Sequence, residues 1–169
     1  AAAALAKLMG VSGQAIGEAL SEFEGLAHRM EYLKTISGIR FFNDSKATTP
    51  HATIAGVSGL RNSVLIAGGR NKGLDLTLLE TLVPILDGVV AIGECAEEVS
   101  EVFKGALEVL TATSMEEAVR KAMKIAASGN GNIILSPACA SFDWYQNYEQ
   151  RGDDFRQIVG QMVKEYQAR

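Results

Sequence analysis

Residues 64–73 read VLIAGGRNKG, an uninterrupted apolar run followed at once by glycines and charged side chains. A second apolar stretch, residues 133–136, reads IILS. A strand with one face in water alternates apolar and polar residues, whereas a strand covered on both faces is apolar throughout. Both stretches therefore predict central strands of a parallel sheet that carries helices on each face.

Shorter β-like runs and helical patterns alternate around these two strands. Runs typical of strands occupy residues 32–36, 39–42, 64–67, 89–92, 108–110 and 133–135. Apolar residues at i, i+3, i+4 and i+7 predict helices most clearly over residues 115–126 and 155–166, and also over 1–9 and 12–23. Ser12 and Thr49 are candidate N-caps, and Pro50 suits a first helical position. This alternation predicts a doubly wound α/β domain with a mostly parallel sheet and right-handed crossovers.

Composition limits the class of protein. The 169 residues are 47% hydrophobic, enough for one substantial core and at most a small appendage. The 16 basic and 20 acidic residues give a net charge of −4, and no basic run suggests nucleic-acid binding. No apolar run approaches the roughly 20 residues that cross a bilayer, and no secretory leader is visible, so we expect a cytoplasmic protein without a membrane partner. Nothing in the sequence requires more than a monomer.

The two cysteines carry no recognisable metal or disulfide pattern. Cys95 and Cys139 lie far apart in the chain, without C-x-x-C spacing or a neighbouring histidine. No residue is marked as a base for Cys139, which suits a small buried position better than a nucleophile. His28 and His51 are single histidines, for which surface or packing roles are the plain interpretation.

Polar clusters follow three of the predicted strands. They are NDSKAT (43–48), GGRNKG (68–73) and SPACASFD (136–143). In open α/β sheets, ligands bind outside the carboxyl ends of the strands, so we expect these loops to form one rim. Two lysines and several hydroxyls there suit a ligand with carboxylates or phosphates, since charge-assisted hydrogen bonds contribute about 1.5 to 3 kcal/mol each.

Turns and helix caps need the same residue types, so the pattern alone leaves open whether these loops bind a ligand or only connect elements. The glycine loop matches neither G-x-G-x-x-G nor G-x-x-x-x-G-K-[ST]. The chain therefore shows neither a dinucleotide fingerprint nor a Walker loop.

Four motifs in fixed order resemble the C-terminal part of the Mur ligases. They are GLAHRME (25–31), FFNDSKATT (41–49), AGGRNKGLDL (67–76) and LSPACASFDWYQNYEQRGDDF (135–155). Within that family the chain is most similar to the branch that adds D-glutamate in peptidoglycan synthesis. The resemblance runs from about Gly25 to the end and implies a Rossmann-like C-terminal domain over residues 26–169. Residues 1–25 look like the closing helices of the central ATPase domain, and a start at Ala1 within an alanine-rich pattern suggests a fragment.

The resemblance also implies a reaction. In this family a carboxylate of UDP-N-acetylmuramoyl-L-alanine is phosphorylated by ATP, the amine of D-glutamate attacks the acyl phosphate, and phosphate leaves. The Walker loop and the ligands of Mg²⁺ belong to the central domain, so no metal ligand is expected here. The fragment by itself is expected to be inactive.

Matching positions carry the family's roles over to this chain. On the ATP side, His28 would contact the nucleotide, Arg29 would neutralise phosphate, and Asp44 would accept hydrogen bonds from ribose hydroxyls. Lys46 would orient Asp44 and supply positive potential. The resemblance thus gives Arg29, Asp44 and Lys46 as catalytic residues, and His28, Arg29 and Asp44 as the ATP contacts.

The amino-acid side involves five further positions. Thr48 and Lys72 match residues that hold the α-carboxylate of D-glutamate. Ser141, the backbone at Phe142, and Tyr148 match those around its side-chain carboxylate.

Two of the residues in this region depart from the family pattern. Tyr148 stands where the family often has Phe, so its hydroxyl could add a donor or crowd the pocket. Arg70 stands where some relatives carry an acid, which leaves open the ion pairing around Lys72 and the pose of the amino acid.

Two other classes stay open beside this interpretation. One is a sibling ligase of the Mur or folylpolyglutamate type, which would add L-alanine, a dibasic residue or a folate glutamate. The other is a non-catalytic α/β module that binds a small molecule. A Rossmann dehydrogenase is disfavoured because its glycine fingerprint is missing.

Overall fold

The computed structural model describes residues 2–23, 25–126 and 131–167. Its helices are α1 (Ala2–Leu8), α2 (Gly13–Glu22), α3 (Pro50–Val57), the 3₁₀ helix η1 (Leu76–Ile85), α4 (Ala96–Phe103), α5 (Met115–Ile125) and α6 (Tyr148–Gln167). Its strands are β1 (Glu31–Ile36), β2 (Ile39–Asn43), β3 (Ser63–Gly68), β4 (Leu86–Ile92), β5 (Glu108–Ala112) and β6 (Asn132–Ala138).

The strands form one six-stranded sheet in the order β1-β2-β6-β3-β4-β5. β1 pairs with β2 in antiparallel fashion, and all the other pairs are parallel. The predicted mostly parallel α/β fold is therefore confirmed. Because β6 lies between β2 and β3, the loops that follow these three strands leave the same edge of the sheet side by side.

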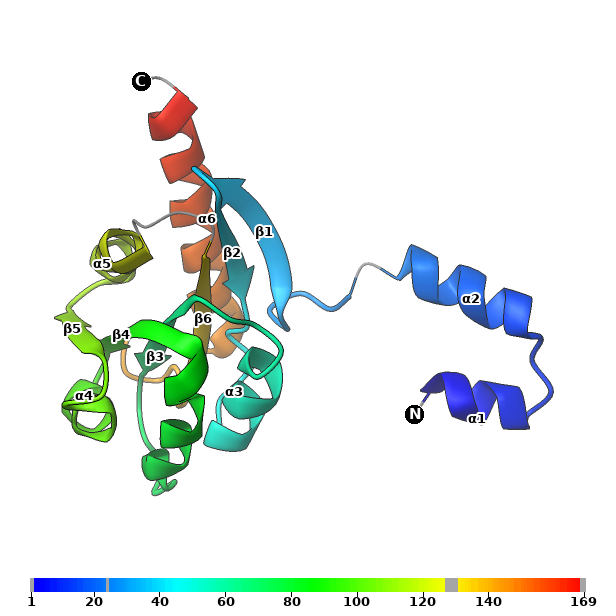
Figure 1. Cartoon of the computed structure of the whole chain (residues 1–169), viewed down its shortest axis with the longest axis horizontal. Coiled ribbons are helices and arrows are strands. Elements are labelled where there is room, and N and C mark those ends of the chain that lie inside the picture. The colour runs from blue at the N-terminus through cyan, green and yellow to red at the C-terminus, as the bar shows by residue number, and fades with distance from the viewer. Residues whose placement is uncertain (1, 24, 127–130, 168–169) are drawn as a thin grey trace.

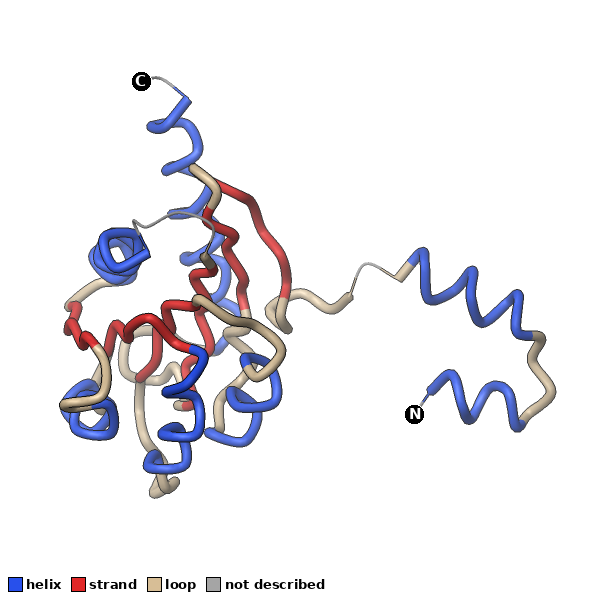
Figure 2. Tube along the Cα trace, viewed as in Figure 1, coloured by secondary structure: helices blue, strands red, loops and turns tan. Residues whose placement is uncertain are grey.

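Helices cover both faces of the sheet (Figures 1 and 2). Val64 and Ile66 of β3 belong to the core cluster that includes α5 and α6. Leu65 and Ala67 belong to the opposite cluster, with α3, η1 and α4. The apolar side chains of residues 64–67 in β3 are therefore buried on both faces of the sheet, as their composition predicts.

Both predicted N-caps are confirmed. The Ser12 hydroxyl accepts a hydrogen bond from the Ala15 amide at 3.1 Å, and the Thr49 hydroxyl accepts one from the Ala52 amide at 3.3 Å. The first predicted helix begins at Ala2, since Ala1 lies outside the described residues. The element η1 shows no 3.6-residue period, because its buried leucines at 76, 79 and 82 follow the three-residue repeat of a 3₁₀ helix.

Helices α1 and α2 stand away from the α/β body (Figure 1). Neither helix contains a buried residue. Leu8, Leu20 and Phe23 are 85%, 62% and 64% exposed, so an apolar surface here faces solvent. The division into domains at residues 25 and 26 stays a prediction. None of the helices in the described part of the chain has the length and apolar character needed to cross a membrane.

Candidate functional site

The loops after β2, β3 and β6 are hydrogen-bonded into one rim. The Arg70 amide donates to the Ala140 carbonyl at 2.8 Å, and the Ala140 amide donates back to Arg70 at 3.1 Å. The Ala138 amide donates to the Ala47 carbonyl at 3.0 Å. The loop after β6 is thus joined to both of its neighbours, which confirms that the three clusters share one edge of the sheet.

Two lysines of the rim lie over aromatic rings. Lys72 Nζ is 4.7 Å from the centroid of Phe142, and Lys46 Nζ is 5.4 Å from that of Tyr148. Both lysines are exposed, and within the described part of the chain neither forms an ion pair. A cation at this distance from a ring face gains little when it is exposed, about 0.5 to 1 kcal/mol, so both charges stay available to an anionic ligand.

The hydroxyl residues assigned to D-glutamate lie on the same rim. Ser141 is 3% exposed and follows Ala140, which pairs with Arg70. Thr48 is partly buried and follows Ala47, which pairs with Ala138. The structure therefore places the loops that carry Thr48, Lys72 and Ser141 next to one another, while their role in binding stays a prediction.

Asp44 is a buried carboxylate held by the protein. Its Oδ1 accepts from the Met30 amide at 3.1 Å and its Oδ2 from the Ser136 hydroxyl at 2.7 Å, and only 4% of the residue is exposed. Burial raises the pKa of Asp44, although the Ser136 and Met30 hydrogen bonds and the Arg29 charge act in the opposite direction. Ser136 and Met30 hold this carboxylate, and Lys46 forms no ion pair with it among the described contacts, so the orienting role of Lys46 stays a prediction.

A cleft of about 480 Å³ contains two of the three residues assigned to ATP, Arg29 and Asp44, whereas His28 is not among its lining residues. Arg29, Asp44 and Lys46 contribute its charged groups. The remaining lining residues are small or apolar: Met30, Ala47, Ala52, Ala55 and Gly56. Gly56 is required here, because a Cβ at that position would lie 2.8 Å from Asp44 Oδ2.

His28 faces inward, with 7% of the residue exposed. Its Nδ1 lies 3.0 Å from the side-chain amide nitrogen of Asn43, within hydrogen-bond distance. The ring stands edge-on to Tyr148 at 6.2 Å, and a Cβ on Gly152 would come within 2.2 Å of Nδ1. The packing interpretation of His28 is confirmed, and its contact with a nucleotide stays a prediction.

Arg70 has an acidic partner of its own. Its Nε and Nη2 donate to the two Glu94 carboxylate oxygens at 2.8 and 2.6 Å. Both side chains are about half exposed. Glu94 thus neutralises the charge of Arg70. Lys72 is not part of this ion pair, so its own positive charge remains on the rim.

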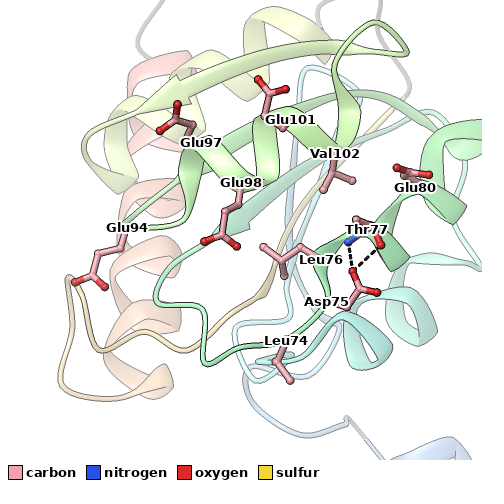
Figure 3. Close-up of a pocket in the computed structure, with 10 residues that line it drawn as sticks. All are labelled: Leu74, Asp75, Leu76, Thr77, Glu80, Glu94, Glu97, Glu98, Glu101 and Val102. Atoms are coloured by element: carbon pink, nitrogen blue, oxygen red, sulfur yellow. Dashed lines mark hydrogen bonds between the residues drawn. The ribbon is translucent and has the colours of Figure 1, made fainter.

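A larger cleft of about 690 Å³ lies between η1 and α4 (Figure 3). Its acidic lining residues are Asp75, Glu80, Glu94, Glu97, Glu98 and Glu101. Glu94 is paired with Arg70 and Glu101 with Lys104, but the other four carboxylates still repel an anion, so the smaller cationic cleft fits a phosphate or carboxylate ligand better. Among the described residues, no group of three or more His, Cys, Asp or Glu side chains is placed to hold a metal ion.

Cys95 and Cys139 are both buried, with their sulfur atoms 3.2 Å apart, and both are free thiols. The structure therefore gives Cys139 the buried position that its sequence context predicts. His51, the other residue with a plain surface interpretation, is exposed.

The sequence interpretation assigned no role to Arg151, which the structure places beneath the rim. Arg151 is 1% exposed and donates to Ser45 and Cys139. The sequence could have indicated that Arg151 is buried. Residues 151, 155, 158 and 162 follow the spacing of one helix face, and the last three are apolar. An arginine on a buried stripe is a signal for a structural or functional contact.

The chain belongs to the family described as "Mur ligase, glutamate ligase domain", whose sequence profile matches residues 28–139. Curated relatives named UDP-N-acetylmuramoylalanine--D-glutamate ligase are similar over nearly the whole chain. The one from Chlamydia caviae is 43% identical over 96% of this chain, and the one from Salinibacter ruber is 46% identical over 94%. The chain spans only 39% and 35% of the lengths of these two proteins.

Solved structures share the fold at low sequence identity. A bifunctional folylpolyglutamate synthase/dihydrofolate synthase from Yersinia pestis matches 88% of this chain and 35% of its own, with a TM-score of 0.62 and 18% identity. A murein peptide ligase from Psychrobacter arcticus matches 94% of this chain and 35% of its own, with a TM-score of 0.55 and 20% identity. At this identity the two structures support the fold alone.

Proposed function

We propose that this chain is the amino-acid-binding domain of an ATP-dependent ligase that adds D-glutamate to UDP-N-acetylmuramoyl-L-alanine in peptidoglycan synthesis. The observation that carries the proposal is the convergence of the loops bearing Lys46, Lys72 and Ser141 on one sheet edge. Relatives that are 43% and 46% identical over nearly all of this chain carry that ligase name.

The chemistry of the rim fits a dicarboxylic amino acid. Each carboxylate of D-glutamate loses water on binding and needs a cation or several donors in return. Lys72 and Thr48 would hold the α-carboxylate. Ser141, the Phe142 backbone and Tyr148 would surround the side-chain carboxylate.

The cationic cleft beside the rim is the proposed ATP side. Arg29 and Lys46 would balance phosphate charge, and Asp44 would accept hydrogen bonds from ribose hydroxyls when its carboxylate is ionised. His28, whose ring stands edge-on to Tyr148, would contact the nucleotide. When bound, ATP supplies the phosphoryl group that activates the carboxylate of the muramoyl substrate.

The described residues offer no cluster of three or more His, Cys, Asp or Glu side chains that could hold magnesium. We place the metal ligands and the phosphate-binding loop in a preceding domain, to which residues 1–25 would belong. Holding the amine of D-glutamate near an activated carboxylate can contribute up to roughly 7 to 11 kcal/mol, and closure of the two domains would provide that alignment. The chain by itself would then be inactive.

The expected setting is a monomer in the cytoplasm, acting without nucleic acid or a membrane. The proposal is tested by phosphate release from the full-length protein with ATP, UDP-N-acetylmuramoyl-L-alanine and single amino acids. D-glutamate should stimulate release, whereas L-alanine, a dibasic amino acid and folate with L-glutamate should not. Stimulation by one of the others would indicate a sibling ligase, and no stimulation by any would indicate a binding module.

A further inference from the structure

Arg151 joins the loops of the rim from below. Its Nε donates to Ser45 Oγ at 3.0 Å and its Nη2 to the Ser45 carbonyl at 2.9 Å. Its Nη1 donates to the Cys139 carbonyl at 3.1 Å. One guanidinium therefore fixes the loop after β2 against the loop after β6.

The loop after β3 also reaches this side chain. A Cβ at Gly69, whose φ is +133°, would lie 3.2 Å from Arg151 Nη1 and 2.2 Å from the Ala140 carbonyl oxygen. Only glycine lets the backbone approach so closely in this conformation. Arg151 thus lies where all three loops of the rim meet.

Among the described residues, Arg151 carries a buried charge without a direct ion pair, although the Asp143 carboxylate lies near enough to favour that charge. Within the described part of the chain it forms no ion pair, and its three hydrogen bonds go to neutral oxygens. The Asp143 carboxylate, whose Oδ2 accepts from the Glu94 amide at 3.0 Å, favours the charged form through space but forms no hydrogen bond with the guanidinium among the described contacts. Burial lowers the pKa of Arg151 to about 10, so the guanidinium remains charged at neutral pH. A buried, unpaired cation is costly unless an anion completes its surroundings.

We propose that Arg151 is a positioning residue for the amino-acid substrate: it sets the geometry of the rim, and its buried positive charge adds to the attraction of the rim for a dicarboxylate. Arg151 does not touch the ligand, because it is 1% exposed. It acts through Ser45 and Cys139, whose neighbours Lys46 and Ser141 face the rim. The identity of the ligand rests on the proposed function.

Two substitutions separate the charge from the fork-shaped geometry. Arg151→Lys keeps the charge but loses the planar fork, and Arg151→Met keeps comparable length but loses both. In the full-length protein, Arg151→Met should raise the KM for D-glutamate at least tenfold and the KM for ATP by a smaller factor, because Ser45 also lies between Asp44 and Lys46 of the ATP side. Arg151→Lys should recover part of that loss. Arg120→Met, which removes an exposed arginine of α5, is the matched control and should leave both values unchanged.

A purely structural role predicts a different result. Equal losses of kcat in Arg151→Lys and Arg151→Met, with an unchanged KM for D-glutamate, would overturn the inference. If either variant fails to fold, Ser45→Ala removes the acceptor of the Nε bond and leaves the charge in place. Ser45→Ala should then raise the KM for D-glutamate two- to fivefold, and an unchanged KM would count against the role.

The phosphate-release assay with the unmodified full-length protein distinguishes a failure of the proposed function from a failure of the proposed role of Arg151. If that protein uses a different amino acid, the proposed function fails, and the Arg151 variants are compared through the KM for that amino acid. If it uses D-glutamate and the variants leave the KM unchanged, the function stands and the inference fails.

Discussion

Lys72 lies with its Nζ 4.7 Å from the centroid of the Phe142 ring, although the two residues come from loops that follow different strands. The same two loops are also joined by the pair of backbone hydrogen bonds between Arg70 and Ala140. The contact between Lys72 and Phe142 places an exposed cation, without an acidic partner among the described residues, over the residue that follows the buried Ser141. Such a pair of loops can close around an anion from two sides.

Lys72→Ala is expected to weaken use of D-glutamate by the full-length protein. Loss of one charge-assisted contact should lower kcat/KM by ~30- to 150-fold, or about 2 to 3 kcal/mol. Steady-state kinetics with varied D-glutamate measure the effect. Lys124→Ala, an exposed lysine at the end of α5, is the matched control. An unchanged D-glutamate dependence in Lys72→Ala would remove this residue from the site.

Two glycine-to-alanine changes in helices should have opposite signs. At Gly160 in α6 a Cβ meets nothing within 4 Å, so the higher helix propensity of alanine should raise the free energy of unfolding by up to ~1 kcal/mol. At Gly56 in α3 the Cβ would meet Asp44 Oδ2 at 2.8 Å, and the net change should be a loss of about 1 to 2 kcal/mol. Urea unfolding of both variants tests this difference. Equal gains would mean that Asp44 is free to move away.

Glu117 should stabilise the protein in a pH-dependent way. Its carboxylate pairs with Lys121 and accepts from the Thr113 amide and hydroxyl, which lowers the pKa of Glu117 from 4.5 to about 2. Because the folded pKa lies below the unfolded value, the contribution is full above about pH 4.5 and is lost as the pH falls towards 2.

The prediction is measured as the difference in Tm between the unmodified protein and Glu117→Gln. The gap should be present at pH 7 and smaller at pH 3. Glu108→Gln, a change at an exposed residue of β5, serves as the control and should show a small gap at both values. A Glu117→Gln gap that widens on acidification would contradict the assigned ion pair and cap.

Helix α2 should exchange its amide hydrogens faster than the body of the fold. It has no buried residue, whereas α5, of similar length, buries Met115, Ala118, Val119, Ala122 and Met123. Local opening needs least free energy where few apolar contacts are lost. Hydrogen exchange in dilute solution compares the two helices directly. If the amides of α2 were as strongly protected from exchange as those of α5, α2 would have to be packed against another part of the protein, which would contradict this prediction.

Much of the fold could be predicted from local sequence patterns. Residues 64–67, for example, are all apolar, which indicates a strand buried on both faces of the sheet. The rim was predictable because the carboxyl ends of parallel strands share an edge. The position of β6 between β2 and β3 was not, since strand order depends on where each crossover packs.

The contacts inside the site were harder to foresee. Asp44 takes its hydrogen bond from Ser136, which lies 92 residues away in the chain. Arg151 is the clearest case: its helix was predicted from apolar spacing, but only tertiary packing shows that its guanidinium meets Ser45 and Cys139.

The most direct test of the shared rim is a ¹⁵N–¹H NMR titration of the labelled full-length protein with D-glutamate, in the presence of the muramoyl substrate and a non-hydrolysable ATP analogue that replaces ATP and prevents turnover. We expect amide shifts confined to residues 45–48, 70–73 and 140–142, with none in α5 and much weaker ones for L-glutamate. Shifts that fall in only one of these segments, or that centre on the acidic cleft between η1 and α4, would contradict the account.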